Sequence, residues 1–291
     1  MPSLSLSLML AALLPLAAQE QGGPRGDEPQ ERAPAPVGQD RPASRPASRP
    51  VVPPAVGPKA ALELAAKARD FAGGKAGWAK VKSIVFTING RHRLLWDKVG
   101  GRVRIEPCGA AASEDPDEAR QKVLYYEEKA DKGWIGDKQD DVATRMARSI
   151  WINDIYWLLF PLMALDNGVR LDFAGLEEGG TGDEKPGPDE KRLVVTFDEK
   201  AVRHGAEYVL WIDEKTGRIR RWDYVAKPGA DALSFWFDRY TKVGPLTLSL
   251  ERPILGTKEV LQFTDVAVDV EVDEAVWRSG DLVLGAIGVK R

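Results

Sequence analysis

Cysteine and histidine are nearly missing from this sequence of 291 residues, which has one cysteine, Cys108, and two histidines, His92 and His204. A single thiol cannot form an internal disulfide, so an apolar core has to supply the stability, and we expect Cys108 to be a semi-buried structural residue. Both histidines stand among charged, turn-like neighbours and are expected to be exposed. The motifs G-x-S-x-G and H-E-x-x-H and the P-loop are absent as well. We therefore predict no catalytic residues, no metal site and no cofactor, so that an enzyme is the least favoured class.

Charge of one sign is not in excess either. The chain has 41 Lys and Arg residues against 44 Asp and Glu residues, a formal net charge of −3, and the two signs alternate along the sequence. Phosphate binding needs a clustered basic surface. The sequence therefore predicts no nucleic-acid partner.

The longest uncharged apolar run lies at the N-terminus, from Leu4 to Ala18. It has the length of the apolar region of a signal peptide and is shorter than the roughly 20 residues of a membrane-spanning helix. Small residues before the polar sequence place cleavage near Ala18. We predict that residues 1–18 are a signal peptide and that the mature protein is exported without a transmembrane span; a short uncleaved anchor is the alternative. No cysteine stands at the predicted cleavage point, so the sequence does not support lipid attachment there.

Residues 19–58 are rich in Pro, Ala, Arg and Gly, include the repeat RPASRPASRP, and contain no aromatic residue. Such a segment cannot bury enough apolar surface to offset its chain entropy. It is predicted to be a disordered linker, either a spacer or an arm that binds peptidoglycan or a partner.

The remaining residues, 59–291, are predicted to form one α+β domain. Residues 59–74 have the composition of a helix that ends at Gly73 and Gly74. Short alternating segments follow, including SIVFTING and the hairpin YVLWIDEKTGRIRRWDYV with Gly217 in its turn. About ten such strands in two groups, with one helical insertion, predict a curved antiparallel sheet or incomplete β-barrel with an N-terminal helix and a mid-chain helical lid.

The insertion holds the most apolar and aromatic stretch of the mature chain, IWINDIYWLLFPLMALDNGVRL at residues 150–171. A helical unit is predicted from Asp140 to Leu165, beginning at an acidic pair that suits a helix N-terminus. Pro161 is expected to interrupt it, and a short second helical piece is expected to end at Gly168. The uncharged part is too short to span a bilayer. Its aromatic face therefore needs a partner surface within the protein.

Four segments carry a resemblance to a known family: the hairpin YVLWIDEKTGRIRRWDY, the terminal FTDVAVDVEVDEAVW, the leading Ala-rich helix, and WINDIYWLLFPL followed by LDNGVRL. Through them the sequence resembles the outer-membrane lipoprotein-sorting (LolA/LolB) superfamily, and within it an uncharacterised exported branch. The resemblance covers residues 59–287. It implies an incomplete antiparallel β-barrel, covered by helices, whose apolar hollow accepts acyl chains, in a periplasmic protein. It also implies a barrel arginine that hydrogen-bonds the lid, which no single residue of the sequence matches.

The resemblance and the aromatic pattern together predict an apolar ligand site. An acyl chain or a lipoprotein is the expected ligand, since each buried methylene contributes about 0.8 kcal/mol. We expect the helical unit to lie over the open side of the sheet with Trp157 and Phe160 facing inward. The candidate lining residues are Trp151, Tyr156, Trp157, Phe160, Met163, Trp222, Tyr224, Phe235 and Phe237.

Two alternatives remain open from the sequence. The same aromatic residues could simply pack the core between helix and sheet. The same fold could also serve as a non-catalytic envelope sensor or scaffold that binds a protein partner, instead of a carrier or chaperone. Lipid that co-purifies with the protein would favour the carrier, and a stable protein partner without lipid would favour the sensor.

Overall fold

The computed structural model describes residues 52–285 with the exception of 110–111, 113–114, 175–186, 188, 199–205, 228, 278 and 280. The predicted signal peptide, residues 19–51 of the predicted linker, and His204 lie outside the described residues. Within the described chain, the helices are α2 (Lys59–Phe71), α3 (Gly74–Lys80), α4 (Pro116–Arg120) and α5 (Asp141–Met163), with a 3-10 helix at Glu274–Trp277.

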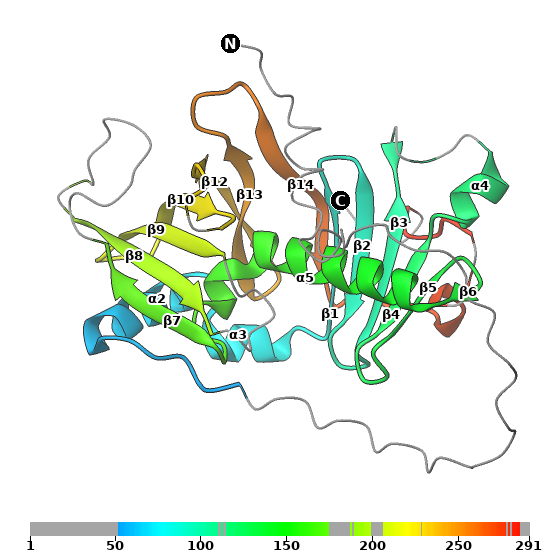
Figure 1. Ribbon diagram of the computed structural model, residues 1–291, viewed down its shortest axis with the longest axis horizontal. Coiled ribbons are helices and arrows are strands. Elements are labelled where there is room, and N and C mark those ends of the chain that lie inside the picture. The colour runs from blue at the N-terminus through cyan, green and yellow to red at the C-terminus, as the bar shows by residue number, and fades with distance from the viewer. Residues whose placement is uncertain are drawn as a thin grey trace, which may run out of the picture. The chain divides into compact units, whose positions relative to one another are not determined.

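The strands form two antiparallel sheets (Figure 1). The nine-stranded sheet has the order β12 (Asp238–Val243), β13 (Leu246–Pro253), β14 (Val260–Val268), β1 (Ser83–Ile88), β2 (His92–Asp97), β3 (Arg102–Pro107), β4 (Leu124–Glu127), β5 (Lys132–Ile135) and β6 (Lys138–Gln139). The five-stranded sheet has the order β11 (Leu233–Trp236), β10 (Ile219–Val225), β9 (Glu207–Asp213), β8 (Glu190–Phe197) and β7 (Val169–Phe173).

The predicted α+β fold with a curved, unclosed antiparallel sheet is confirmed, although the strands are divided differently. The segment SFWFDRYTKV, expected to continue one meander, breaks at Phe237 into β11 and β12, which belong to different sheets. The Phe237 N–H donates to the Arg220 carbonyl at 2.7 Å, whereas Asp238 already pairs with Glu251 of β13. The two sheets meet here through a bridge between Phe235 and Ile254.

The long helix α5 begins as the sequence predicts, with Asp140 as its N-cap: the carboxylate accepts a hydrogen bond from the Ala143 N–H at 2.7 Å. The predicted interruption at Pro161 is wrong. The helix continues through Pro161 to Met163, and a turn, not a second helical piece, leads to Gly168. Among the described helices, none combines the length and the apolar character needed to cross a membrane.

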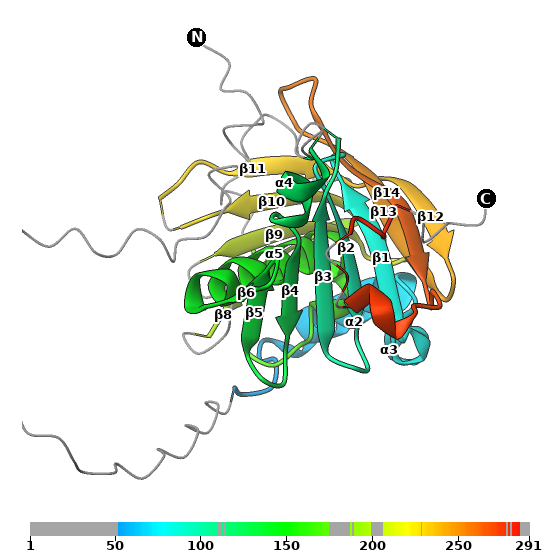
Figure 2. The same cartoon turned by 90° about the vertical axis from the view of Figure 1, so that its right-hand side faces the viewer.

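Two segments cover opposite faces of the nine-stranded sheet. Helix α5 crosses the molecule from β5 and β6 toward the five-stranded sheet, and Figure 2 shows it behind β3 and β4 while the C-terminal segment lies in front. On the C-terminal side, Trp277 and Leu284 pack with Val85 and Leu95 in a small apolar cluster. The sheet therefore has two packed faces, and the long helix α5 reaches from one sheet to the other.

The described chain starts inside the segment that the sequence assigns to the linker. The Val56 N–H donates to the Val169 carbonyl at 3.0 Å, and the Leu171 N–H donates to the Val56 carbonyl at 2.9 Å. Residues 53–57 thus run along β7. The domain boundary near Lys59 stays a prediction.

Candidate binding site between α5 and the five-stranded sheet

The five-stranded sheet presents one apolar face. Strand register places Trp222 of β10 opposite Leu210 of β9 and Phe235 of β11, and it places Tyr224 opposite Tyr208. Because side chains alternate across a strand, all of these point to the same face. The other face is mixed: it carries the buried Trp211 beside a buried ion pair between Arg221 and Asp223.

The C-terminal half of α5 packs on that apolar face, as the sequence analysis expects. The Trp157 ring stacks on Trp222 with centroids 4.8 Å apart and meets Phe235 edge-on at 5.0 Å. Phe160 lies 5.3 Å from Trp222 and 5.2 Å from Tyr208. Only 3% of Trp157 and none of Phe160 is exposed. We call this group of packed rings, from α5 and the five-stranded sheet, the aromatic interior: Trp157, Phe160, Tyr208, Trp222 and Phe235.

A buried arginine completes the aromatic interior. Arg252 of β13 is fully buried, and its guanidinium donates hydrogen bonds to the carbonyls of Trp157 and, at 3.3 Å, Leu158. In a helix the Trp157 carbonyl would accept from residue 161, but Pro161 has no N–H. Arg252 therefore supplies the donor that Pro161 lacks, which explains why the helix continues through the proline. These hydrogen bonds join β13 of the nine-stranded sheet to α5.

Arg252 is a costly residue for a protein interior. Among the described residues no carboxylate forms an ion pair with it, and it lies instead over the rings of Phe237 at 4.0 Å and Trp222 at 5.4 Å. Burial lowers the pKa of its guanidinium to about 9, because desolvation disfavours the charged form. Burial likewise raises the pKa of the Tyr240 hydroxyl, an effect that the charge of Arg252 opposes.

Two buried N–H donors of the aromatic interior lack a hydrogen-bond partner within the described part of the chain: Nε of Arg252 and Nε1 of Trp222. A buried donor without an acceptor costs about 1–3 kcal/mol. The guanidinium of Arg252 lies over the ring of Trp222, 5.4 Å from its centroid, so the two donors belong to neighbouring side chains. The site thus combines an apolar surface with unused donors at one place.

The middle of α5 is bound to the nine-stranded sheet by a polar pair. His92 of β2 and the buried Asp154 of α5 are joined by a hydrogen bond of 2.5 Å between Nε2 and Oδ2. The expectation that His92 is exposed is wrong, because the residue is half-buried and only 26% of its side chain is accessible to solvent. The charged neighbours of His92 in the sequence indicate a turn, but they do not show that the imidazole ring points toward α5. Closer to the N-terminus of α5, the Gly133 N–H donates to the Thr144 hydroxyl at 2.8 Å.

The structure brings most of the predicted lining residues together. Ring contacts link them into one group, which contains Tyr156, Trp157, Phe160, Trp222, Tyr224, Phe235 and Phe237. Met163 is buried at the end of α5. Trp151 lies apart: it contacts Trp96 at 5.6 Å and Tyr126 at 5.5 Å, on the nine-stranded sheet.

Sequence reasoning missed Arg252 and Asp154. A signal for Arg252 does exist, because in LTLSLERP it shares strand parity with the buried Leu246 and Leu248. An arginine at a core position of an amphipathic strand indicates a buried cation with a specific role. No comparable signal marks Asp154. Cys108 is half-buried, as expected, and burial raises the pKa of its thiol, as is typical of an unreactive cysteine.

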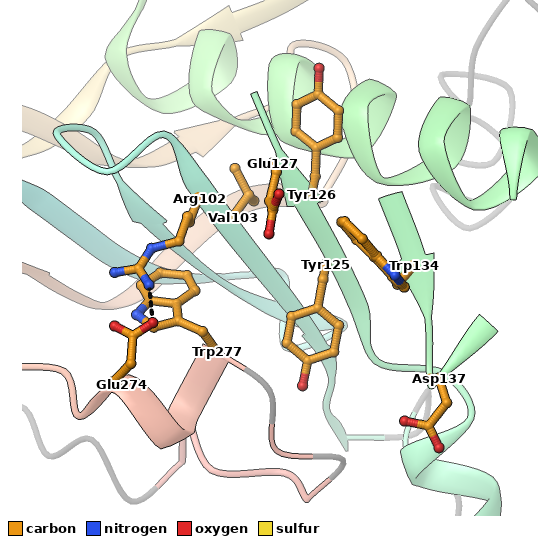
Figure 3. Close-up of a pocket in the computed structure, with 10 residues that line it drawn as sticks. Arg102, Val103, Tyr125, Tyr126, Glu127, Trp134, Asp137, Glu274 and Trp277 are labelled. Carbon is orange, nitrogen blue, oxygen red and sulfur yellow. Dashed lines mark hydrogen bonds and ion pairs between the residues drawn. The ribbon is translucent and has the colours of Figure 1, made fainter. Parts of the chain in front are cut away.

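A cavity of about 320 Å³ lies elsewhere, on the face of the nine-stranded sheet that the C-terminal segment covers (Figure 3). None of the predicted lining residues borders it. Its walls include Tyr125, Trp134 and Trp277, together with the charged residues Arg102 and Glu127.

No protein-family model and no curated protein sequence matches the chain. The solved structures that are similar to it include three that each cover 75% of the chain. One is a LolA superfamily protein from Nitrosomonas europaea, with 10% identity, a TM-score of 0.37 and 97% of that chain covered. The second is a DUF1329 family protein from Desulfovibrio piger, with 13% identity, a TM-score of 0.36 and 96% of that chain covered. The third is a domain from Vibrio parahaemolyticus described as outer membrane lipoprotein-sorting, with 12% identity, a TM-score of 0.34 and 95% of that chain covered. Two of these three descriptions name the LolA superfamily or outer membrane lipoprotein sorting.

Proposed function

We propose that the protein binds an acyl chain, either of a free lipid or of a lipoprotein, between the C-terminal half of α5 and the apolar face of the five-stranded sheet, and that it acts as an exported carrier or chaperone. The observation that carries this proposal is the pair of buried donors without acceptors, Arg252 Nε and Trp222 Nε1, inside an otherwise aromatic interior. Burial of an N–H group without an acceptor disfavours the folded state, so a ligand that supplies an acceptor at this place would be bound more tightly.

The free energy gained by burying an acyl chain is large enough to offset the ring contacts that the chain would replace. The interior is already filled by rings, so an acyl chain has to replace part of the contact between α5 and the sheet. Each methylene that enters contributes about 0.8 kcal/mol, whereas an aromatic pair contributes about 0.5–1.5 kcal/mol beyond its buried area. A chain of ordinary length therefore offsets the loss of several ring contacts, and α5 acts as the lid.

Arg252 gives the ligand its polar anchor in this account. When α5 moves, the guanidinium loses the Trp157 and Leu158 carbonyls as acceptors. The carboxylate of a fatty acid or the ester carbonyl of a lipid replaces them, and it also accepts from the indole N–H of Trp222. A hydrogen bond to a charged group contributes about 1.5–3 kcal/mol, which corresponds to roughly a tenfold to hundredfold gain in affinity.

Titration with a dansyl-labelled fatty acid tests this proposal. Arg252→Met should weaken binding at least tenfold, and Trp222→Phe, which removes only the indole donor, should weaken it several-fold. Arg104→Met is the matched control, because Arg104 is equally buried but holds the C-terminal segment through the carbonyls of Val276 and Ser279. Equal affinity for all four proteins, or no binding by the wild type, would contradict the proposal. A stable protein partner in that second case would favour a sensor or scaffold.

We further propose that residues 1–18 are removed on export to the periplasm and that the linker, from residue 19 to the point where residues 53–57 run along β7, separates the domain from the processed N-terminus. The apolar run that ends at Ala18 supports this. N-terminal sequencing of the protein from a periplasmic extract should start near Gln19. A start at Met1 in membrane-extracted protein would contradict it.

A further inference from the structure

The cavity on the C-terminal side of the nine-stranded sheet is separate from the aromatic interior. Strand register places Arg104 opposite Tyr125 and Tyr125 opposite Trp134, so these side chains share the face that points away from α5. The 3-10 helix brings Glu274 and Trp277 over the same face (Figure 3). The cavity of about 320 Å³ is large enough for a small organic group.

Its walls combine aromatic rings with unneutralised carboxylates. Arg102, the positive residue of the lining, forms ion pairs with Asp97 at 3.0 Å and Glu274 at 2.6 Å, so its charge is already compensated. Glu127 and Asp137 also line the cavity, and neither forms an ion pair with another described residue. The carboxylates of the lining therefore outnumber its one cation, although Arg102 and Lys132 both stand opposite Glu127 in register.

The rings on this face already hold cations of the chain itself. The guanidinium of Arg102 lies 4.5 Å from the centroid of Trp277, and that of Arg104 lies 4.9 Å from the centroid of Tyr125. An aromatic face attracts a cation within about 6 Å of its centroid, and Trp does so most strongly. Trp134 adds a half-buried indole to the same cavity, next to Tyr125.

We propose that this cavity is a second binding site, for an organic cation that carries an ammonium group. Trp134 supplies an aromatic wall, and Glu127 and Asp137 supply the opposing charge. The recognised chemistry is shared by small quaternary amines and by the lysine side chain of a peptide. The site is independent of acyl binding, since α5 lies on the other face of the sheet.

Isothermal titration with matched probes tests the proposal. Choline and its neutral isostere 3,3-dimethyl-1-butanol have the same shape, so their difference reports the charge alone. We expect choline or N-acetyl-lysine methylamide to bind at least tenfold more tightly than the neutral compound. The tighter of the two cations identifies the source as a small amine or a peptide side chain.

Variants locate the site. Trp134→Leu and Glu127→Gln should each weaken cation binding several-fold, and Glu127 is exposed, so that its replacement leaves the fold intact. Trp236→Leu is the matched control, because Trp236 is also half-buried but lies on β11 of the other sheet. Equal binding of choline and its neutral isostere, or affinity unchanged in both cavity variants, would overturn the proposal, as would no binding of either cation.

Discussion

The pairing of Arg252 with the carbonyl that Pro161 leaves free predicts a measurable coupling between two residues far apart in the sequence. Arg252→Met keeps the side-chain volume close to that of arginine and removes the hydrogen bond to the Trp157 carbonyl. Pro161→Ala restores the N–H that can donate to the same carbonyl within α5. The decrease in the free energy of unfolding caused by Arg252→Met should therefore depend on which residue stands at position 161.

The expected size follows from that one carbonyl. With Pro161 present, Arg252→Met leaves the Trp157 carbonyl buried without a donor, which costs about 1–3 kcal/mol. With Ala at position 161, the helix satisfies the carbonyl and this cost disappears. The interaction energy of the double-mutant cycle should therefore be about 1–3 kcal/mol, well above the roughly 0.5 kcal/mol that separates additive from coupled sites.

Urea unfolding of the wild type, both single variants and the double variant gives the cycle. Pro161→Ala is expected to stabilise on its own, because proline disfavours a helix interior, but only the difference between the two Arg252→Met effects decides. If Arg252→Met costs the same free energy of unfolding in both backgrounds, the reason given for the continuous helix is wrong.

Three further results are expected. Trp157→Ala should lower the free energy of unfolding by about 3–5 kcal/mol and weaken binding of the dansyl-labelled fatty acid about tenfold. Trp151→Ala, on the same helix, should lower the free energy of unfolding without changing that affinity, and equal effects of the two variants on affinity would exclude a ligand site at Trp157. His92→Leu should destabilise the protein in urea unfolding by about 1–3 kcal/mol by leaving the Asp154 carboxylate unpaired, and Asp154→Leu in the same chain should recover much of it; an unrecovered loss would speak against the pair. Gly133→Ala should cost about 1–3 kcal/mol, because its methyl group would stand 2.5 Å from the Thr144 Cα; a melting temperature equal to the wild type would show that α5 lies less tightly on β5.

The sequence predicted those features that local chemistry decides. Asp140 begins α5 because its carboxylate accepts from an amide three residues later, and Gly217 adopts a φ of 77° in the turn between β9 and β10. The alternation of RRWDY places Trp222 and Tyr224 on one face, and the strand register of the structure adds Tyr208 to it. Each of these signals lies within a few residues of the structure that it specifies.

Features that depend on distant partners were not predictable in the same way. The helix passes through Pro161 because of Arg252, whose hydrogen bond to Trp157 joins residues 95 positions apart. The pairing of His92 with Asp154 spans 62 positions. The sequence places Trp151 and Trp157 on one helix and so predicts one site for both. Because α5 crosses between two sheets, only the tertiary structure shows which sheet each ring meets.

Native mass spectrometry of the protein isolated from its own cell envelope tests the central claim most directly. If α5 and the five-stranded sheet enclose an acyl chain, the spectrum should contain a species heavier than the chain by one acyl lipid or one lipoprotein. Arg252→Met should reduce its share, and Arg104→Met should leave it unchanged. A spectrum with only the bare mass, both as isolated and after incubation with palmitate, would contradict the account.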